Sequence, residues 1–108
     1  MHINEFARIA HERDRKHDKN KAFNWEFYSI AMGGEAGEVL NNVKKLKRGD
    51  PISKEEFFKD LAEEAADVIT FGFLLLSELG ADPEKILLEK YEKVNRRLDD
   101  GGFHKRPE

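Results

Sequence analysis

The chain has 108 residues, of which 19 are basic and 22 are acidic, and it contains no cysteine. This length allows one domain, and the lack of cysteine excludes disulfides, thiol nucleophiles and cysteine-ligated zinc. The acidic balance argues against binding nucleic acid through phosphate neutralisation. No apolar run approaches the roughly 20 residues that cross a membrane, and the first residues do not resemble a signal peptide. We therefore expect a folded cytoplasmic protein.

The residue pattern predicts helices and no strands. A first helix of about four turns begins near Ile3, where apolar residues recur at the helical period, and it ends in the charged stretch 13–21. A second helix begins after Asn24, a good N-cap. It ends at Gly49, which follows a basic cluster at residues 44–48. Such a cluster suits the negative end of a helix dipole, and its functional alternative is a rim that attracts a triphosphate.

Capping residues predict two further helices. Ser53 followed by Glu56 has the form of a capping box, which begins a third helix that Gly80 closes. The pair Asp82-Pro83 supplies an N-cap and a first-turn proline for a fourth helix, which runs to about Leu98.

These elements predict one all-α domain over residues 1–108, similar to a four-helix bundle, with a mobile tail at 103–108. The third helix also predicts assembly. Residues 68–76 are apolar on nearly every face, so this segment must be surrounded, and three other helices cover only some of its sides. We expect a second copy of the chain to cover the rest, in a homodimer or a dimer of dimers.

Two short segments each carry a pair of acids three residues apart. Glu35 and Glu38 form one pair on the second helix, and Glu64 and Asp67 form the other on the third. Residues at this spacing share one face of a helix, where like charges repel. A cation would relieve the repulsion, and oxygen ligands without His or Cys nearby favour Mg²⁺ or Mn²⁺. The alternative is that all four are ordinary exposed charges of a highly charged chain.

Small residues precede and separate these acids. They are Gly33, Gly34, Ala36, Gly37, Ala65 and Ala66. Because Gly inside a helix costs about 0.8–1 kcal/mol relative to Ala, three glycines so close together need a reason. We expect that they let the second and third helices approach closely, so that the four carboxylates converge on a cation.

The order E-x-x-E, a 25-residue interval and then E-x-x-D on the following helix resembles the signature of the MazG-like, all-α nucleoside triphosphate pyrophosphohydrolases. The similarity covers residues 25–97. It implies Mg²⁺-dependent hydrolysis of an NTP or dNTP to the monophosphate and pyrophosphate, on a helical dimer or dimer of dimers. The metal ligands that it implies are Glu35, Glu38, Glu64 and Asp67.

The sequence departs from this pattern at one position. Many relatives have E-E-x-x-E, whereas Gly34 stands here in place of the first acid. One carboxylate is therefore missing. Glu63 is a substitute, although it points about 100° around the helix from Glu64.

Cations and aromatic rings complete the expected substrate site. The candidates for binding the phosphates, near the end of the fourth helix, are Lys90, Lys93, Asn95, Arg96 and Arg97. Basic residues also favour the last turns of a helix through the dipole alone. Trp25, and Phe71 one turn after Asp67, are candidates for stacking on the base, and packing in the core or at a dimer interface is the alternative. The histidines lack ligand spacing, and we assign them no role.

We therefore predict a Mg²⁺-dependent nucleotide pyrophosphohydrolase that removes an unwanted NTP or limits a dNTP pool. Two alternatives stay open. One is an enzyme similar to phosphoribosyl-ATP pyrophosphohydrolase, which also uses an all-α carboxylate site. The other is a non-catalytic helical module that binds a partner protein, in which the acidic pairs are solvated and the apolar third helix is an interface.

Overall fold

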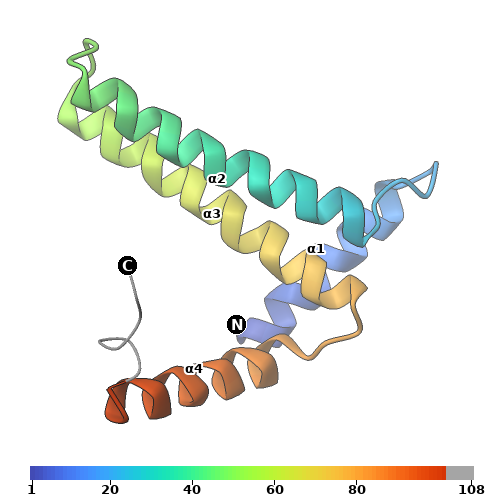
Figure 1. The fold of residues 1–108 in the computed structure, drawn as a ribbon. Coiled ribbons are helices and arrows are strands. Elements are labelled where there is room, and N and C mark those ends of the chain that lie inside the picture. Colours follow the sequence, from blue (N-terminus) through green and yellow to red (C-terminus); the bar gives the residue numbers. More distant parts are fainter. Residues whose placement is uncertain (102–108) are drawn as a thin grey trace.

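The computed structural model describes residues 1–101, which form four helices and no strand (Figure 1). The prediction of an all-α chain is confirmed over these residues, whereas the expected tail at 103–108 lies outside them. No helix in the described part combines the length and the apolar character needed to cross a bilayer. The helices are α1 (Ile3–His17), α2 (Trp25–Lys47), α3 (Lys54–Glu78) and α4 (Pro83–Asp99).

Three of the helices begin where their capping residues predict. The side chains of Asn24, Ser53 and Asp82 each accept a hydrogen bond from the backbone N–H three residues further on, at 2.9, 3.1 and 3.1 Å. Pro83 occupies the first position of α4, where its missing N–H has no intrahelical partner to lose. These hydrogen bonds confirm the predicted starts of the three helices. The starts could be predicted because a cap joins a side chain to a backbone N–H only three residues away.

The ends of α2 and α3 also follow the sequence. Gly49 has φ +92° and Gly80 has φ +71°, both in the left-handed region that glycine adopts without a steric penalty. The N–H of Asp50 donates to the carbonyl of Lys45, five residues earlier, at 3.1 Å. A hydrogen bond that likewise spans five residues closes α3. Both helices therefore end in the C-terminal motif that a glycine at this position allows.

The long helices α2 and α3 run antiparallel as a hairpin and lie against each other along their length (Figure 1). Helix α1 packs across the C-terminal end of α3, which is the lower end in Figure 1. Helix α4 contacts α1 and α3, but it diverges from α3 and makes no contact with α2 within the described residues. A single chain thus has the four predicted helices, of which only two are paired along their whole length.

The core of the described chain is small and lies near the crossing of α1 and the hairpin. Tyr28 and Leu74 are fully buried, Ala10 joins them, and Phe23 and Phe71 pack around this cluster. Within the apolar segment 68–76 only Leu74 is buried, and Ile69 is 56% exposed. The expectation that the chain's own helices leave one side of this segment uncovered is therefore confirmed.

Candidate functional site

Three of the four predicted carboxylates meet at the seam between α2 and α3. Glu35, Glu64 and Asp67 each offer one oxygen, and these oxygens all lie within 4.8 Å of one another. The oxygen ligands of a six-coordinate Mg²⁺ lie about 3 to 4 Å apart, as its metal–oxygen distances of about 2.0–2.1 Å dictate. The three oxygens are therefore close to the spacing that a bound divalent cation requires.

Glu64 is the member of this group that most needs a partner. Its Oε2 is buried and has no hydrogen-bond donor within the described residues when its neighbours are ionised. A proton on one acid lets Glu64 and Glu35 hydrogen-bond. That bond, followed by desolvation and the charges of Glu35, Asp67 and Glu38, raises the pKa of Glu64 to about 7.

Either a proton or a cation resolves this repulsion. A divalent cation would give Glu64 Oε2 a partner and would neutralise the charges that raise the pKa of Glu64. Three carboxylate oxygens with no nitrogen or sulfur ligand form a donor set that fits Mg²⁺ or Mn²⁺. The residues present therefore fit the metal that the sequence predicts.

The fourth predicted ligand, Glu38, is exposed and does not belong to the converging group. Its charge is nevertheless one of the causes that raise the pKa of Glu64, so it lies within electrostatic reach of the seam. Glu63 is also exposed and lies outside the group, as its direction around the helix predicts. Glu38 is thus placed beside the candidate site, where it can contact water.

The expectation that glycines bring α2 close to α3 is wrong. A Cβ atom built on Gly33, Gly34 or Gly37 would meet no other atom within 4 Å. All three residues are exposed, because the face of α2 that carries them does not point at α3. The position of the missing first acid, Gly34, therefore has free space around it in a single chain.

The structure does not bring the predicted phosphate-binding residues to the carboxylates. Helix α4, which carries them, makes no contact with α2 in the described chain and diverges from α3 (Figure 1). Lys90, Lys93 and Arg96 are exposed, and Asn95 is half-buried. A single chain therefore contains the acidic half of the predicted site without its basic half.

The two candidate base-stacking residues differ in their surroundings. Trp25 is 56% exposed, so packing in the core of the single chain is excluded for it. It lies ten residues before Glu35, which is about 15 Å along the helix and about 80° around it. Phe71 is half-buried, and its ring centroid lies 6.5 Å from that of Tyr28. Phe71 thus packs against the core close to the carboxylates.

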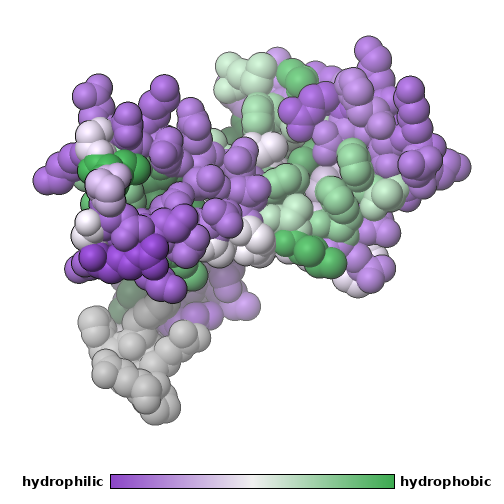
Figure 2. All heavy atoms as spheres, turned by 90° about the horizontal axis from the view of Figure 1, so that it is seen from above, coloured by the Kyte–Doolittle hydropathy of each residue, from purple (hydrophilic) through white to green (hydrophobic). Residues whose placement is uncertain are grey.

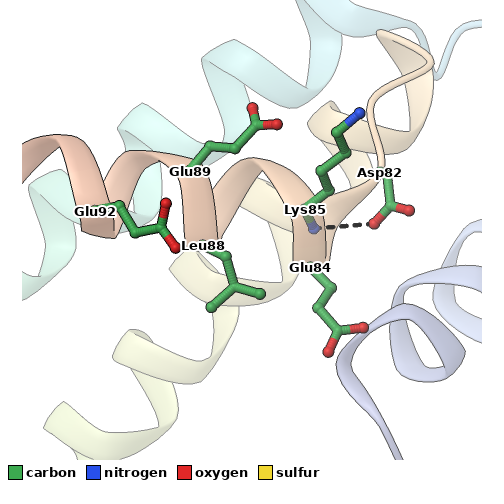
Figure 3. Close-up of a pocket in the computed structure, with 6 residues that line it drawn as sticks. All are labelled: Asp82, Glu84, Lys85, Leu88, Glu89 and Glu92. Carbon is green, nitrogen blue, oxygen red and sulfur yellow. Dashed lines mark hydrogen bonds between the residues drawn. The ribbon is translucent and has the colours of Figure 1, made fainter.

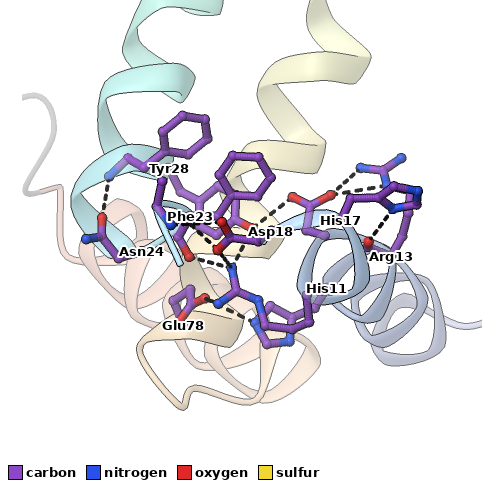
Figure 4. Close-up of polar contacts among 12 residues, drawn as sticks. His11, Arg13, His17, Asp18, Phe23, Asn24, Tyr28 and Glu78 are labelled. Carbon is purple, nitrogen blue, oxygen red and sulfur yellow. Dashed lines mark hydrogen bonds and ion pairs between the residues drawn. The ribbon is translucent and has the colours of Figure 1, made fainter. Parts of the chain in front are cut away.

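A polar cluster that the sequence analysis missed joins α1 to the hairpin (Figure 4). Arg15 lies at its centre, with Nη1 3.0 Å from Oε1 of Glu78 and with Nη2 donating to the carbonyl of Phe23 and to the hydroxyl of Tyr28. Nε2 of His11 lies 3.3 Å from the same Glu78 oxygen. A histidine to which we assigned no role therefore contacts the end of α3.

The buried end of this cluster is formed by Tyr28. Its hydroxyl donates to Oδ2 of Asp14 at 2.8 Å. Burial, followed by the hydrogen bond to Asp14, raises the pKa of Tyr28 to about 12, so the hydroxyl keeps its proton. Asp18 accepts from the N–H groups of Ala22 and Phe23 at 2.8 and 2.9 Å, which fixes the loop between α1 and α2.

The sequence carries only a weak signal for this cluster. Asp14, Arg15 and Asp18 fall in the charged stretch 13–21, which resembles a solvated segment, and Glu78 lies far away in the sequence. Tyr28 gives one hint, because it lies two turns before Glu35 on the same face of α2. A tyrosine hydroxyl that is buried on such a face needs a hydrogen-bond partner.

A shallow hollow of about 310 Å³ at the start of α4 offers no alternative site for a nucleotide (Figure 3). Acids dominate its lining, with Asp82, Glu84, Glu89 and Glu92 surrounding the single base Lys85. Such a lining repels a triphosphate. The carboxylate seam between α2 and α3 is therefore the better candidate.

Comparison with known proteins finds a similarity to a phage protein. The chain is 30% identical to the Gene 37 protein of Mycobacterium phage L5 over 76 residues, which cover 69% of this chain and 67% of that protein. No protein-family model matches the chain, and no solved structure matches it. The name of the phage protein states no activity, so the chemistry has to be argued from the carboxylates themselves.

Proposed function

The chain belongs to the same family as the Gene 37 protein of Mycobacterium phage L5, and from its carboxylate seam we propose that it is a divalent-metal-dependent nucleotide pyrophosphohydrolase. One observation carries this proposal. The buried Oε2 of Glu64 lacks a donor and lies beside Glu35 and Asp67, an arrangement that a cation would stabilise. The resemblance of the paired-acid order to the MazG-like enzymes supports the choice of reaction.

Each acid has a role in this proposal. Glu35, Glu64 and Asp67 would hold Mg²⁺ or Mn²⁺, which neutralises triphosphate charge and lowers the pKa of a bound water. Glu38, exposed beside the seam, accepts a proton from the attacking water. Water then cleaves the α–β anhydride bond of an NTP or dNTP, which yields the nucleoside monophosphate and pyrophosphate.

The remaining substrate contacts belong to α4 and to the aromatic residues. We propose that Lys90, Lys93, Asn95 and Arg96 bind phosphates and that Trp25 or Phe71 contacts the base. Because α4 does not contact α2 within one chain, these basic residues reach the carboxylates from another copy in a homodimer or dimer of dimers. The enzyme would act in the cytoplasm on an unwanted NTP or on a dNTP pool.

A second candidate function is a non-catalytic module that binds another protein. The observation that favours it is the apolar surface left open on α3, including Ile69. This candidate predicts neither metal binding nor pyrophosphate release.

The experiment that separates these functions measures pyrophosphate release from a panel of standard and modified NTPs, with Mg²⁺ and with EDTA. We expect Mg²⁺-dependent release from at least one substrate. Glu64→Gln should lower it by about 100-fold, because it removes a ligand charge without changing shape. Glu63→Gln makes the same change at the neighbouring exposed acid and should leave the rate within about twofold. No release from any nucleotide by the unmodified protein would overturn the proposal.

A further inference from the structure

An apolar hollow lies beside the carboxylate seam, on one side of the α2–α3 hairpin. Its volume is about 470 Å³, which falls within the range of pockets that hold small molecules. We define the apolar hollow by its lining residues, which are Ala36, Val39, Leu40, Ala65, Val68 and Ile69. All six are aliphatic, so among the described residues none that lines the hollow has a side chain that hydrogen-bonds. Their backbone N–H and C=O groups belong to α2 and α3 and bond within those helices.

The apolar hollow begins where the acids end. Ala36 directly follows Glu35 in the chain, and Ala65 directly follows Glu64. The third acid, Asp67, is likewise followed by a residue that lines the hollow. One residue is a step of about 100° around a helix, and because α2 and α3 are antiparallel these steps lead to the same side of the seam. A molecule held at the acids can therefore extend directly into the hollow.

The position of Phe71 sets the direction in which a bound nucleotide would run. Phe71 lies one turn after Asp67, about 6 Å along the helix, and Ile69 lies between them in the chain. Apolar side chains lie open on the surface in Figure 2, and Ile69 is 56% exposed. If the phosphates bind at Asp67 and the base contacts Phe71, the sugar between them lies level with Ile69 and next to the hollow.

The three parts of a nucleotide differ in how well they suit an aliphatic lining. Phosphates are charged, and the edge of a base carries several donors and acceptors that would lose their partners there. The carbon skeleton of a sugar loses little. A 2′-hydroxyl, however, would give up its hydrogen bonds to water and gain none, whereas the CH₂ group of a deoxyribose has none to lose.

We propose that the apolar hollow receives the sugar of the substrate and selects 2′-deoxyribose, so that the protein hydrolyses dNTPs in preference to NTPs. This inference rests on the proposed pyrophosphohydrolase function and narrows its substrate class. An apolar pocket discriminates against an added hydroxyl by up to about 100-fold. Leu40 is 72% exposed, so the hollow stays partly open to water, and we expect a preference of about 10-fold.

The first test measures kcat/KM for four pairs of substrates that differ only at the 2′ position. They are dATP and ATP, dGTP and GTP, dCTP and CTP, and dUTP and UTP. In every pair that is hydrolysed, the deoxynucleotide should have the higher value, by about 10-fold. Equal values, or higher values for the ribonucleotides, would overturn the sugar selection and leave the proposed reaction standing. No release from any of the eight would overturn the proposed reaction, and the sugar selection with it.

A second test measures binding without turnover. Calorimetry in Mg²⁺ compares the α,β-imido analogues of the deoxy and ribo members of the pair that is hydrolysed fastest. The deoxy analogue should bind about 10-fold more tightly. Equal dissociation constants would overturn the selection of the sugar by the hollow.

A pair of valine substitutions locates the effect. Val68→Thr keeps the shape of a side chain that lines the hollow and adds a hydroxyl. Even when that hydroxyl donates to the backbone carbonyl of Glu64, its oxygen still accepts from a ribose 2′-hydroxyl. The preference for dNTP should therefore fall by about threefold or more. Val43→Thr makes the same change on α2 outside the hollow and should keep the original preference. Equal preferences in the two variants would overturn the placement of the sugar.

Discussion

Glu35 and Glu64 face each other across the α2–α3 seam, and the hydrogen bond that they share when one is protonated is the largest cause of the raised pKa of Glu64. A carboxyl group with a pKa of about 7 is half protonated near neutral pH. A divalent cation bound at the same place would displace that proton. Metal binding at this pair of acids would therefore compete with protonation, which makes the proposed site testable by pH.

The first prediction concerns the stability of the metal-free protein. Folding raises the pKa of Glu64 from its ordinary value of 4.5 to about 7, so the native state binds this proton more tightly than the unfolded chain does. The contribution of Glu64 is fully present below about pH 4.5 and is lost as the pH rises through 7. We expect the melting temperature in EDTA to fall over this range, and to fall less in Glu64→Gln. An identical pH dependence in both proteins would contradict the shift, and Glu63→Gln serves as the control.

The second prediction separates metal binding from proton transfer. Asp67 belongs to the converging group, whereas Glu38 lies outside it and is exposed. Asp67→Asn should weaken Mg²⁺ binding measured by calorimetry, because it removes a ligand charge. Glu38→Gln should keep Mg²⁺ binding and lower kcat by about 100-fold, the lower end of the effect of a general base. Full activity in Glu38→Gln would remove the role proposed for that residue.

The third prediction uses the free space around Gly34. Because an added Cβ meets nothing there, Gly34→Ala should stabilise α2 by about 1 kcal/mol through helix propensity, which raises the melting temperature by several degrees. Gly49 also has free space, but its φ of +92° strains any other residue, so Gly49→Ala should destabilise the protein. Destabilisation by Gly34→Ala would show that another molecule occupies the space beside Glu35.

The fourth prediction concerns the polar cluster that attaches α1. Tyr28→Phe removes the buried hydroxyl that donates to the half-buried Asp14 and accepts from the exposed Arg15, so both partners lose a hydrogen bond. We expect a loss of about 1–3 kcal/mol in the free energy of unfolding, measured by urea denaturation. Tyr91→Phe changes the other tyrosine, which is exposed, and should alter stability by less than about 0.5 kcal/mol. Equal effects of the two substitutions would contradict a structural role for the cluster.

The sequence predicted the features of this chain that depend on neighbouring residues. The starts of α2, α3 and α4 follow from Asn24, Ser53 and Asp82, because a cap joins a side chain to a backbone group three residues away. The sharing of one helix face by Glu64 and Asp67 follows in the same way from helical geometry. Three carboxylates of the predicted site consequently converge as expected.

The features that depend on how helices rotate and cross were not predictable in this way. The face of α2 that carries Gly33, Gly34 and Gly37 points away from α3, which their sequence positions do not reveal. The contact between His11 and Glu78 joins residues 67 positions apart and forms only because α1 packs against the end of α3. The direction of α4 likewise depends on a turn and on what covers α3, so the distance from its basic residues to the carboxylates could not be read from the sequence.

The last prediction tests whether one copy supplies the acids and another the cations. Glu64→Gln should lower pyrophosphate release by about 100-fold through the metal site, and Lys93→Met should also lower it strongly, through phosphate binding. If each site combines the acids of one chain with α4 of its partner, a mixture refolded together contains heterodimers with one intact site. Random pairing makes half of the dimers heterodimers, so activity should return to about one quarter of that of the unmodified protein.

The matched control for this mixture pairs Glu64→Gln with Asp67→Asn. Both changes lie on α3 in the same group of acids, so every site in their mixture keeps one damaged chain and no activity should return. Recovery with Lys93→Met and none with Asp67→Asn would place α4 of one copy at the carboxylates of another. No recovery in either mixture, with both pairs forming mixed dimers, would instead mean that each chain completes its own site, which requires α4 to swing toward α2 from the position in which the two helices make no contact.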